Sequence, residues 1–257
     1  QYSPDIRLHG EAYRTGAGAE RQAWEWALRN VPVTAAGAET NSRLSILSSQ
    51  EGAAFAEKLS IAANGNFSAG TANTLSASPG FVIGANNNVS GYLGCAIGSS
   101  CTVAVTGGIA SGIGAVSNHY GEFARTSGLI ASGGDAQYVI FTARRQTTDA
   151  TANVELTADN QAAAAANRFT IADKTAYSLS VRVVGKHAGD AHMYSGVFSV
   201  AVVNNGGTTT GTVGAVVDEI NTLAGTAAVS VAINDANDAV QVHVTGTAGE
   251  TINWMAT

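Results

Sequence analysis

Two histidines near the beginning of the last third of the chain are the residues most suited to metal chemistry. His187 and His192 flank Ala188-Gly189-Asp190-Ala191, and a loop of this length can bring both imidazoles together. In a trimer, a histidine near the axis occurs three times, which would supply the ligands of a metal site. Exposed loop histidines are the default interpretation, so the sequence assigns no metal site.

A second candidate for ion binding is the oxygen-rich segment Asn234-Asp235-Ala236-Asn237-Asp238. Carboxylate and amide oxygens are the ligands of hard cations, but the segment lacks the glycine and the terminal glutamate of a twelve-residue calcium loop. A plain turn is the favoured interpretation, because Asn and Asp side chains bond readily to nearby backbone amides.

Catalytic motifs are missing from the sequence. It has no G-x-S-x-G elbow, no phosphate-cradling loop and no H-E-x-x-H helix. The glycines of Gly16-Ala17-Gly18 and Gly206-Gly207 are isolated turn glycines, without the βαβ unit of a dinucleotide site. The sequence therefore predicts no enzyme, with no catalytic, cofactor-binding or metal-binding residue and no cofactor.

Three further groups of residues keep two interpretations open. A glycosidase-type carboxylate pair can come from different strands or chains, although the acids in question occur in polar, turn-like contexts that solvation explains. Trp24 and Trp26 share one face of a strand and either stack on a sugar or, as favoured, lie in a core. Cys95 and Cys101 either form a disulfide or are two small, partly buried side chains. The acids are Asp149, Asp159, Asp173 and Asp218.

Cys95 and Cys101 lie within a 14-residue repeat between Phe81 and Ala136, which is the most informative feature of the chain. The copies are FVIGANNNVSGYLG, CAIGSSCTVAVTGG, IASGIGAVSNHYGE and FARTSGLIASGGDA. Position four holds Gly84, Gly98 and Gly112, and the pattern breaks at Thr126. A period this short excludes helical-pair solenoids and propeller blades, which need about 33–50 residues per unit. It fits one turn of a β-coil with two strands of about five residues and two tight turns.

Composition narrows the class of protein. Charged residues make up 12% of the chain, against about 25% in soluble domains. The net charge of −6, and the absence of a basic stripe, argue against a nucleic-acid partner. No run of about 18 apolar residues is present, so no membrane insertion is expected. Without an initiating Met or a signal-peptide pattern at Gln1, we expect a processed product, a fragment or part of a longer protein.

The sequence predicts an all-β chain in three parts. Residues 1–70 form an N-terminal β module, with strands around Ile6–Leu8, Trp24–Leu28, Leu44–Ile46 and Leu59–Ile61. Residues 71–136 form the β-roll, with the boundary in the polar stretch 68–78. Residues 137–257 form an antiparallel β-sandwich or jelly roll of about eight strands.

Within that last part, one segment is a clear hairpin and two are ambiguous. Val229–Ile233 and Val240–Val244 alternate around a turn, which is typical of a β-hairpin. The segment 213–223 fits either a strand or a helix. Ala162–Ala166 holds a helical turn or, as favoured, caps a loop.

The repeats carry a family resemblance. CAIGSS and FVIGAN resemble the left-handed parallel β-roll of trimeric adhesin heads, which also occurs in bacteriophage fibres. The opening SPDIRLHGEAYRTGAGAERQAWEWALRNVPV, the stretch 119–159 (HYGEFARTSGLIASGGDAQYVIFTARRQTTDATANVELTAD) and the ending VHVTGTAGETINWMA resemble phage tail-fibre and virion proteins. Residues 119–159 are the most specific part.

This resemblance implies an intertwined homotrimer on the virion surface. The expected function is a structural and host-contact component of a phage particle, a trimeric tail fibre or spike region that binds by avidity. Its expected partners are its own copies, other virion proteins and a host surface glycan or protein. The alternatives are a capsid decoration protein, a polysaccharide-degrading tailspike and a bacterial trimeric adhesin.

Overall fold

The computed structural model describes residues 6–13, 21–33, 41–50, 56–62, 64–223, 225 and 227–257. These residues form strands, turns and one 3-10 turn, η1 (Asp235–Asn237), and none of the described ranges contains an α-helix. The chain divides into two compact units, residues 1–118 with 124–138 and residues 119–123 with 139–257. The predicted all-β class is confirmed.

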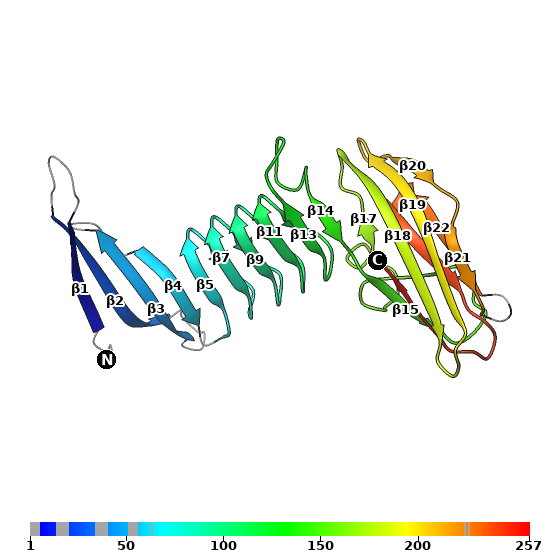
Figure 1. Ribbon diagram of the computed structural model, residues 1–257, viewed down its shortest axis with the longest axis horizontal. Helices are drawn as coiled ribbons and strands as arrows, with labels where there is room; N and C mark the ends of the chain where they lie inside the picture. Colours follow the sequence, from blue (N-terminus) through cyan, green and yellow to red (C-terminus); the bar gives the residue numbers. More distant parts are fainter. Residues whose placement is uncertain are drawn as a thin grey trace. The chain divides into compact units, whose positions relative to one another are not determined.

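One continuous sheet runs through the first unit (Figure 1), so the N-terminal strands and the β-roll share a single hydrogen-bonded surface. Its strands are, in spatial order, β1 (Ile6–Tyr13), β2 (Arg21–Val33), β3 (Asn41–Gln50), β4 (Ala56–Ala62), β5 (Phe67–Thr71), β7 (Phe81–Ala85), β9 (Cys95–Ser99), β11 (Ile109–Ile113), β13 (Phe123–Thr126) and β14 (Tyr138–Ile140).

Strands β1 to β5 form an antiparallel meander. The alternation around Trp24–Leu28 belongs to a strand, as predicted, and Asn64–Asn66 is a turn in which Gly65 takes a φ of +85°. The predicted turn at 15–18 lies outside the described residues. So do the side chains of Trp24 and Trp26, and their interpretation as core residues stays a prediction.

The repeat forms a parallel coil in exact 14-residue register. Phe81 is opposite Cys95, and Cys95 is opposite Ile109. The same register pairs Phe67 with Phe81 and Thr74 with Asn88, so a further turn precedes the predicted four. The coil therefore passes through the polar stretch 68–78 that the sequence predicted to be a boundary. That turn was missed because Ser68 stands where later copies place Val or Ala.

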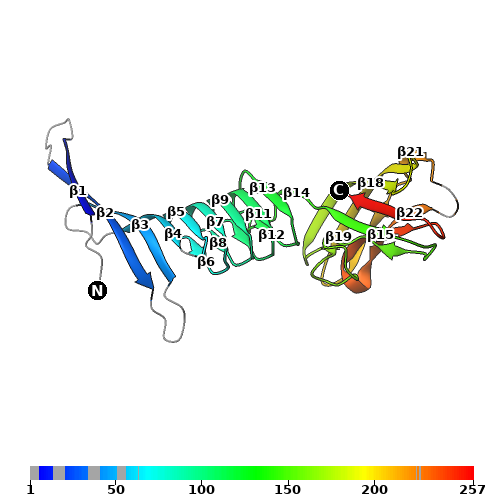
Figure 2. The same cartoon turned by 90° about the horizontal axis from the view of Figure 1, so that it is seen from below.

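Each turn also carries a second, shorter strand, visible in Figure 2. These strands are two residues long, and the prediction of about five was wrong because the chain bends away after each pair. The fourth predicted copy has only its first strand, β13, so four complete turns span residues 67–122. The hand of the coil stays a prediction. The short strands are β6 (Thr74–Leu75), β8 (Asn88–Val89), β10 (Thr102–Val103) and β12 (Val116–Ser117).

The coil interior is built from small side chains that stack one above another. Position two contributes Val82, Ala96, Ala110 and Ala124, all fully buried, and position nine contributes Val89, Val103 and Ser117. Between the two facing strands there is room for a Val–Ala layer and little more. The low side-chain volume seen in the sequence is therefore what allows such a narrow coil.

Glycine at position four is required by the close approach of successive turns. Gly98 takes a φ of +134°, and a Cβ atom placed on it would lie 1.9 Å from the carbonyl oxygen of Gly112. Only glycine fits such a backbone at this spacing. Gly70, Gly84 and Gly112 meet their neighbours in the same way, and Thr126 ends the column.

An internal ladder of polar side chains fills the corner next to this column. The Asn87 side chain donates to the Asn73 Oδ1 atom at 3.1 Å and to the Gly98 carbonyl at 3.0 Å. Its own Oδ1 accepts the Cys101 backbone N–H at 2.9 Å. The ladder satisfies backbone groups that the corner removes from the strand pairing, which a buried backbone requires.

A loop of residues 127–137 covers the last turn of the coil. The Gln137 amide accepts the Val116 N–H and donates to the Val116 carbonyl, both at 2.9 Å. The Gln137 side-chain amide thereby replaces the peptide group that a further strand of the coil would pair with the edge of β12. The Asp135 carboxylate holds the loop by accepting the backbone N–H groups of Ile130, Ala131 and Ser132, and these bonds lower the pKa of Asp135.

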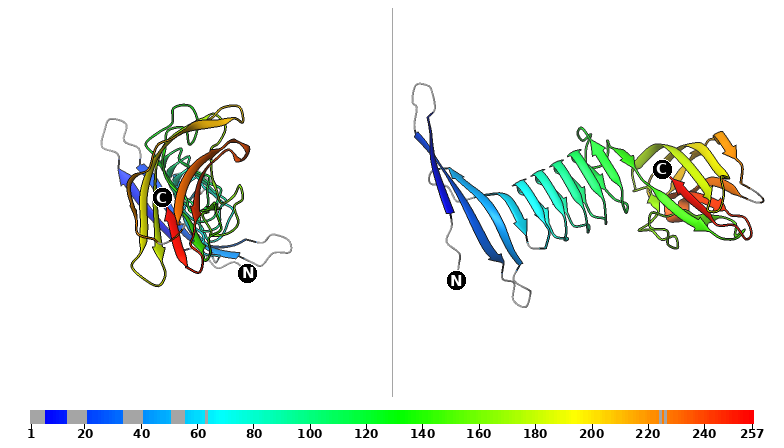
Figure 3. Two further views of the ribbon diagram at one scale, coloured as in Figure 1. Left: turned by 90° about the vertical axis from the view of Figure 1, so that its right-hand side faces the viewer. Right: turned by 60° about the horizontal axis from the view of Figure 1, so that its bottom comes forward.

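The second unit is a sandwich of two mainly antiparallel sheets, seen from two directions in Figure 3. The larger sheet contains β15 (Ala143–Thr147), β24 (Ile252–Ala256), β18 (Thr175–His187), β19 (Met193–Asn204), β20 (Thr209–Val213) and β21 (Val217–Asn221). The smaller sheet contains β16 (Val154–Glu155), β23 (Ala239–Thr245), β17 (Phe169–Thr170) and β22 (Ala228–Asn234).

The inward faces of both sheets share one core, in which Val183 and Val200 of the larger sheet join Val244 of the smaller. Trp254 is buried, lies 6.0 Å from Tyr194 between ring centroids and donates its indole N–H to Thr147 Oγ1 at 3.0 Å. The core therefore ties together residues far apart in the sequence.

The ambiguous segments of this unit are resolved by the strand pairings. Residues 213–223 contribute the end of β20 and all of β21, and they contain no helical turn. Ala162–Ala166 lies in a loop, as favoured. The predicted hairpin is confirmed as β22 and β23 around η1.

Candidate functional site

The outward face of the long coil strands is the first candidate surface. We call it the long-strand face; it consists of positions one, three and five of the four complete turns, and none of its residues is charged. Ile97 is 44% exposed and Ile113 51% exposed, although both are large and apolar. Its residues are Phe67, Ala69, Thr71, Phe81, Ile83, Ala85, Cys95, Ile97, Ser99, Ile109, Ser111 and Ile113.

The outward positions of the short strands are different in character. They hold Thr74, Asn88 and Thr102 at position eight, with only Val116 apolar at that place. The coil thus presents one apolar and one polar surface, although the same 14-residue unit builds both. Contiguous apolar surface of this kind marks an interaction site, because single exposed apolar side chains would need no explanation.

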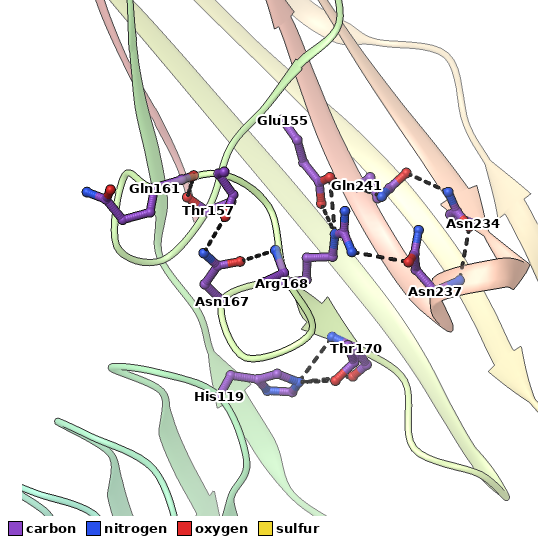
Figure 4. Close-up of polar contacts among 12 residues, drawn as sticks. His119, Glu155, Thr157, Gln161, Asn167, Arg168, Thr170, Asn234, Asn237 and Gln241 are labelled. Atoms are coloured by element: carbon purple, nitrogen blue, oxygen red, sulfur yellow. Dashed lines mark hydrogen bonds and ion pairs between the residues drawn. The ribbon is translucent and has the colours of Figure 1, made fainter.

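The second candidate is a buried polar triad in the second unit, formed by Glu122, His119 and Thr170. Figure 4 shows the contacts between His119 and Thr170. The Nδ1 atom of His119 lies 2.6 Å from Glu122 Oε2, and its Nε2 atom lies 3.1 Å from Thr170 Oγ1. The order carboxylate, imidazole, hydroxyl is the order that activates a nucleophile in hydrolases.

The surroundings of this triad fit a structural role better than acyl transfer. His119 is only 3% exposed and stacks on Phe169 at 4.8 Å between ring centroids, with Phe141 edge-on at 5.6 Å. The Thr170 N–H also donates to Nε2 at 3.1 Å, so the lone pair that would take the hydroxyl proton is already used. The triad therefore binds segment 119–123 to β17.

A third polar cluster lies on the smaller sheet. Arg168 donates to both carboxylate oxygens of Glu155, at 2.9 and 3.2 Å, and to Asn237 Oδ1 at 3.1 Å. Gln241 donates to Glu155 Oε2 and accepts from Asn234, each at 3.1 Å (Figure 4). The contacts satisfy one another across β16, β23 and η1, so the cluster is a closed network that stabilises the sheet.

The two predicted histidines are brought together at the tip of the β18–β19 hairpin. Asp190 lies between them, with His187 Nδ1 at 2.9 Å and His192 Nδ1 at 3.1 Å from its carboxylate. A backbone bond from His192, followed by the two imidazoles, lowers the pKa of Asp190. Over the described ranges, no group of three or more His, Cys, Asp or Glu side chains is arranged to hold a metal ion.

Segment 234–238 is a turn, as favoured, and its oxygens are used within the protein. Asn234 caps η1 by accepting the Asn237 N–H. Asp235 accepts the Thr209 N–H, and Asp238 accepts the Thr209 hydroxyl at 2.7 Å. This turn therefore joins β22 and β23 to the start of β20.

Three of the four candidate acids, Asp149, Asp159 and Asp173, lie in turns or loops, whereas Asp218 lies in strand β21 and not in the turn-like context expected for it. Asp149 accepts the Thr151 N–H, Asp159 the Gln161 N–H and Asp173 the Gly206 N–H. Asp218 takes a positive φ within β21. Each of the first three stabilises backbone, which is the solvated, turn-forming role expected for it.

The cysteines are free, so the disulfide alternative is wrong. Cys101 lies inside the coil, and Cys95 is half-buried at position one of the long-strand face. Burial raises the pKa of the Cys95 thiol. The structure also brings together a pair that sequence analysis missed, His119 and Glu122, whose only signal was a His and an acid three residues apart in HYGE.

Comparisons with known proteins assign no function to these candidate sites. No protein-family model and no curated protein matches the sequence. Among solved structures, the chain is similar to the Acinetobacter phage vB_ApiP_P1 tailspike protein, with 13% sequence identity, a TM-score of 0.27 and coverage of 74% of this chain. It spans 44% of that tailspike's length. Similarity this low defines no common function.

No described segment forms a helix long and apolar enough to cross a membrane.

Proposed function

We propose that the chain is a structural and host-contact component of a phage particle, a trimeric tail-fibre or spike region that binds without catalysis. Its assignment to a phage virion surface rests on the sequence resemblance of residues 119–159. Its assembly as a homotrimer rests on the coil, whose long-strand face is uncharged and apolar. In this arrangement three copies bury that face against one another.

The long-strand face is the observation that carries the proposal. Burying a large aliphatic or aromatic side chain contributes about 1.5–3 kcal/mol. The face exposes Phe81, Ile83, Ile97, Ile109 and Ile113 in a single sheet. A coil with an interior of Val and Ala gains little from its own core, so association of copies supplies the missing apolar burial.

A trimer also explains how such a module would bind a host surface. Three identical, individually weak sites that engage together raise the apparent affinity without any new contact. The partner is a host glycan or protein, and the stiff coil holds the binding modules at a fixed spacing. No chemical step on the partner is part of the proposal.

A capsid decoration protein is the second candidate, and the same face favours it. There the apolar residues would dock on other virion proteins instead of on copies of this chain. The two functions differ in what the isolated chain does, since only the fibre or spike region assembles without the rest of the particle.

The test is the molar mass of the purified chain by light scattering. We expect a stable species of three times 25.9 kDa. Ile97→Lys should weaken association by at least tenfold, which corresponds to about 1.4 kcal/mol, because a lysine would have to be buried. Asn88→Lys on the short-strand side is the matched control and should leave the mass unchanged. A monomeric wild-type chain would contradict the trimer and favour the decoration protein.

A further inference from the structure

The larger sheet of the sandwich carries apolar residues on the face that is turned away from its core. An antiparallel sheet that packs one face on a core usually has polar residues on the other. Val184 of β18, Met255 of β24 and Ile220 of β21 depart from this pattern, with exposed fractions of 40%, 48% and 56%. We call this surface the outer sandwich face, and its apolar members are Val184, Met193, Val217, Ile220 and Met255.

The strand register makes these residues neighbours. Met255 is opposite Val184 on β18, which in turn is opposite Ser195 on β19. Ser195 is opposite Ile220, so one row of paired residues crosses four strands. Met193 lies beside Ser195 on the same face of β19, so the serine does not interrupt the apolar surface. Adjacent strands lie about 4.8 Å apart, which makes the row about 14 Å long. Contiguous apolar surface of this size marks an interaction site.

Three cations border this surface on the side of β15, β24 and β18. Arg144 is opposite Met255. Arg182 and Lys186 lie two residues to either side of Val184 on β18. The second unit exposes four Lys and Arg side chains, and three of them are these. In the part of the chain that the structure describes, none of the three forms an ion pair with a carboxylate.

Acids border the same surface on the side of β21. Asp218 and Glu219 are exposed and lie between Val217 and Ile220 in that strand. β21 pairs with β19 on the side of β19 that is opposite to β18. The outer sandwich face thus has a basic side, an apolar middle and an acidic edge. Such a surface is complementary to a second copy of itself, because the basic side of one copy attracts the acidic edge of another.

We propose that the outer sandwich face is an interface between copies of this chain, in which the basic side of one sandwich packs against the acidic β21 edge of the next. This contact rests on the proposed trimer, and it adds a second interface to the long-strand face of the coil. A contact between two different patches closes into a ring when the rotation between copies suits it. An apolar centre with a polar rim is also the usual anatomy of a protein interface.

Methionine oxidation of the full chain tests whether this face is covered. Both methionines of the chain, Met193 and Met255, lie on it. Hydrogen peroxide converts accessible methionine into its sulfoxide, and peptide mass spectrometry measures the rate at each position. In the trimer, we expect both to react at least tenfold more slowly than in the urea-unfolded chain.

Two contrary results have different meanings. A trimer whose methionines react as fast as in the unfolded chain would overturn this interface while leaving the trimer itself intact. The outer sandwich face would then be left to another virion protein or to an acidic glycan. A chain that stays monomeric would contradict both the proposed trimer and this interface.

Salt separates the two interfaces in the wild-type chain. The long-strand face has no charged residue, so salt should not weaken association through the coil. Charges at the rim of the sandwich contact are screened at an ionic strength of about 1 M, where the Debye length is about 3 Å. We expect Met193 and Met255 to react at least threefold faster at high salt in a species that light scattering still finds trimeric. An unchanged rate would contradict a contact between charges.

Arg182→Glu tests the charge pairing directly. It places an acid where the acidic edge of the next copy would lie, so the protection of Met255 should fall at least fivefold. Lys174→Glu is the matched control, because Lys174 is the remaining exposed cation of the second unit and lies outside this face, in the turn before β18. It changes the net charge by the same amount and should leave the oxidation rate unaltered. Equal protection of Met255 in the two variants would refute the proposal.

Discussion

In both the coil and the sandwich, strand edges are covered and apolar side chains are buried by contacts between strands. The sequence separation between the contacting strands differs greatly between the two. In the coil, each long strand pairs with the strand 14 residues away, as Cys95 does with Ile109. In the sandwich, β15 pairs with β24, which joins Thr147 to Ile252. One unit is thus built by repetition and the other by closure between the two ends of its sequence.

The two interiors differ in the same way. The coil interior repeats Val and Ala at fixed positions, and its shape is set by the backbone at the glycine column. The sandwich interior depends on large side chains, with Trp254, Tyr194 and Phe198 all buried. A substitution in the coil should therefore act through backbone conformation, and one in the sandwich through lost volume.

Trp254→Ala should produce the largest difference in stability between the sandwich and the coil. Removing a buried Trp side chain from a packed core costs about 3–5 kcal/mol, and the Thr147 hydroxyl also loses its indole partner. We expect the thermal transition of the sandwich to move down strongly, while exchange protection of the coil amides stays unchanged. Calorimetry together with hydrogen exchange measures both effects.

Asn253→Ala is the control for this substitution. Asn253 is the preceding residue of the same strand, but its side chain points to the exposed face. Its replacement should change stability by less than about 0.5 kcal/mol. A loss of coil protection in Trp254→Ala would show that the two units do not unfold independently.

Most of the coil could be predicted from the sequence because its pairing partners recur at one spacing. The glycines at position four and the aliphatic residues at positions two and nine mark the register directly. The first turn was missed because Ser68 is atypical for position two, where later copies place Val or Ala. The length of the short second strands was overestimated because a strand of two residues shows no alternation of apolar and polar side chains in the sequence.

The sandwich could be predicted only as a class. Alternation locates β18, β19, β22 and β23, but it carries no information on which strand lies beside which. The pairing of β18 with β24 depends on the packed core as a whole. The His119–Glu122 pair escaped prediction for a related reason, since its partner Thr170 is 51 residues away.

Gly98→Ala tests whether the stability of the coil depends on backbone conformation at the glycine column. A methyl group at Gly98 would overlap the Gly112 carbonyl, and a φ of +134° is strained for any L side chain. We expect a loss of about 2–3 kcal/mol in the free energy of unfolding of the coil. Hydrogen exchange of β9 and β11 should rise, while that of the sandwich stays constant.

Gly128→Ala is the control for the glycine column. Nothing lies within 4 Å of a Cβ atom placed at Gly128. This substitution should leave coil stability nearly unchanged. If both glycine variants lost the same stability, the close approach of the turns at Gly98 would not be the cause of the loss, since Gly→Ala by itself lowers the entropy of the unfolded chain and favours folding.

The smallest expected effect concerns the end of the coil, where repetition stops and a single side chain takes over. Gln137→Ala removes two hydrogen bonds to Val116 and should cost about 1–2 kcal/mol, with faster exchange of the Val116 amide. Gln137→Glu keeps the acceptor for the Val116 N–H but loses the donor to the Val116 carbonyl. We therefore expect the Val116 amide to stay protected in Gln137→Glu and to become exposed in Gln137→Ala. Equal exchange in both variants would mean that packing of the loop, and not the amide, closes the edge of β12.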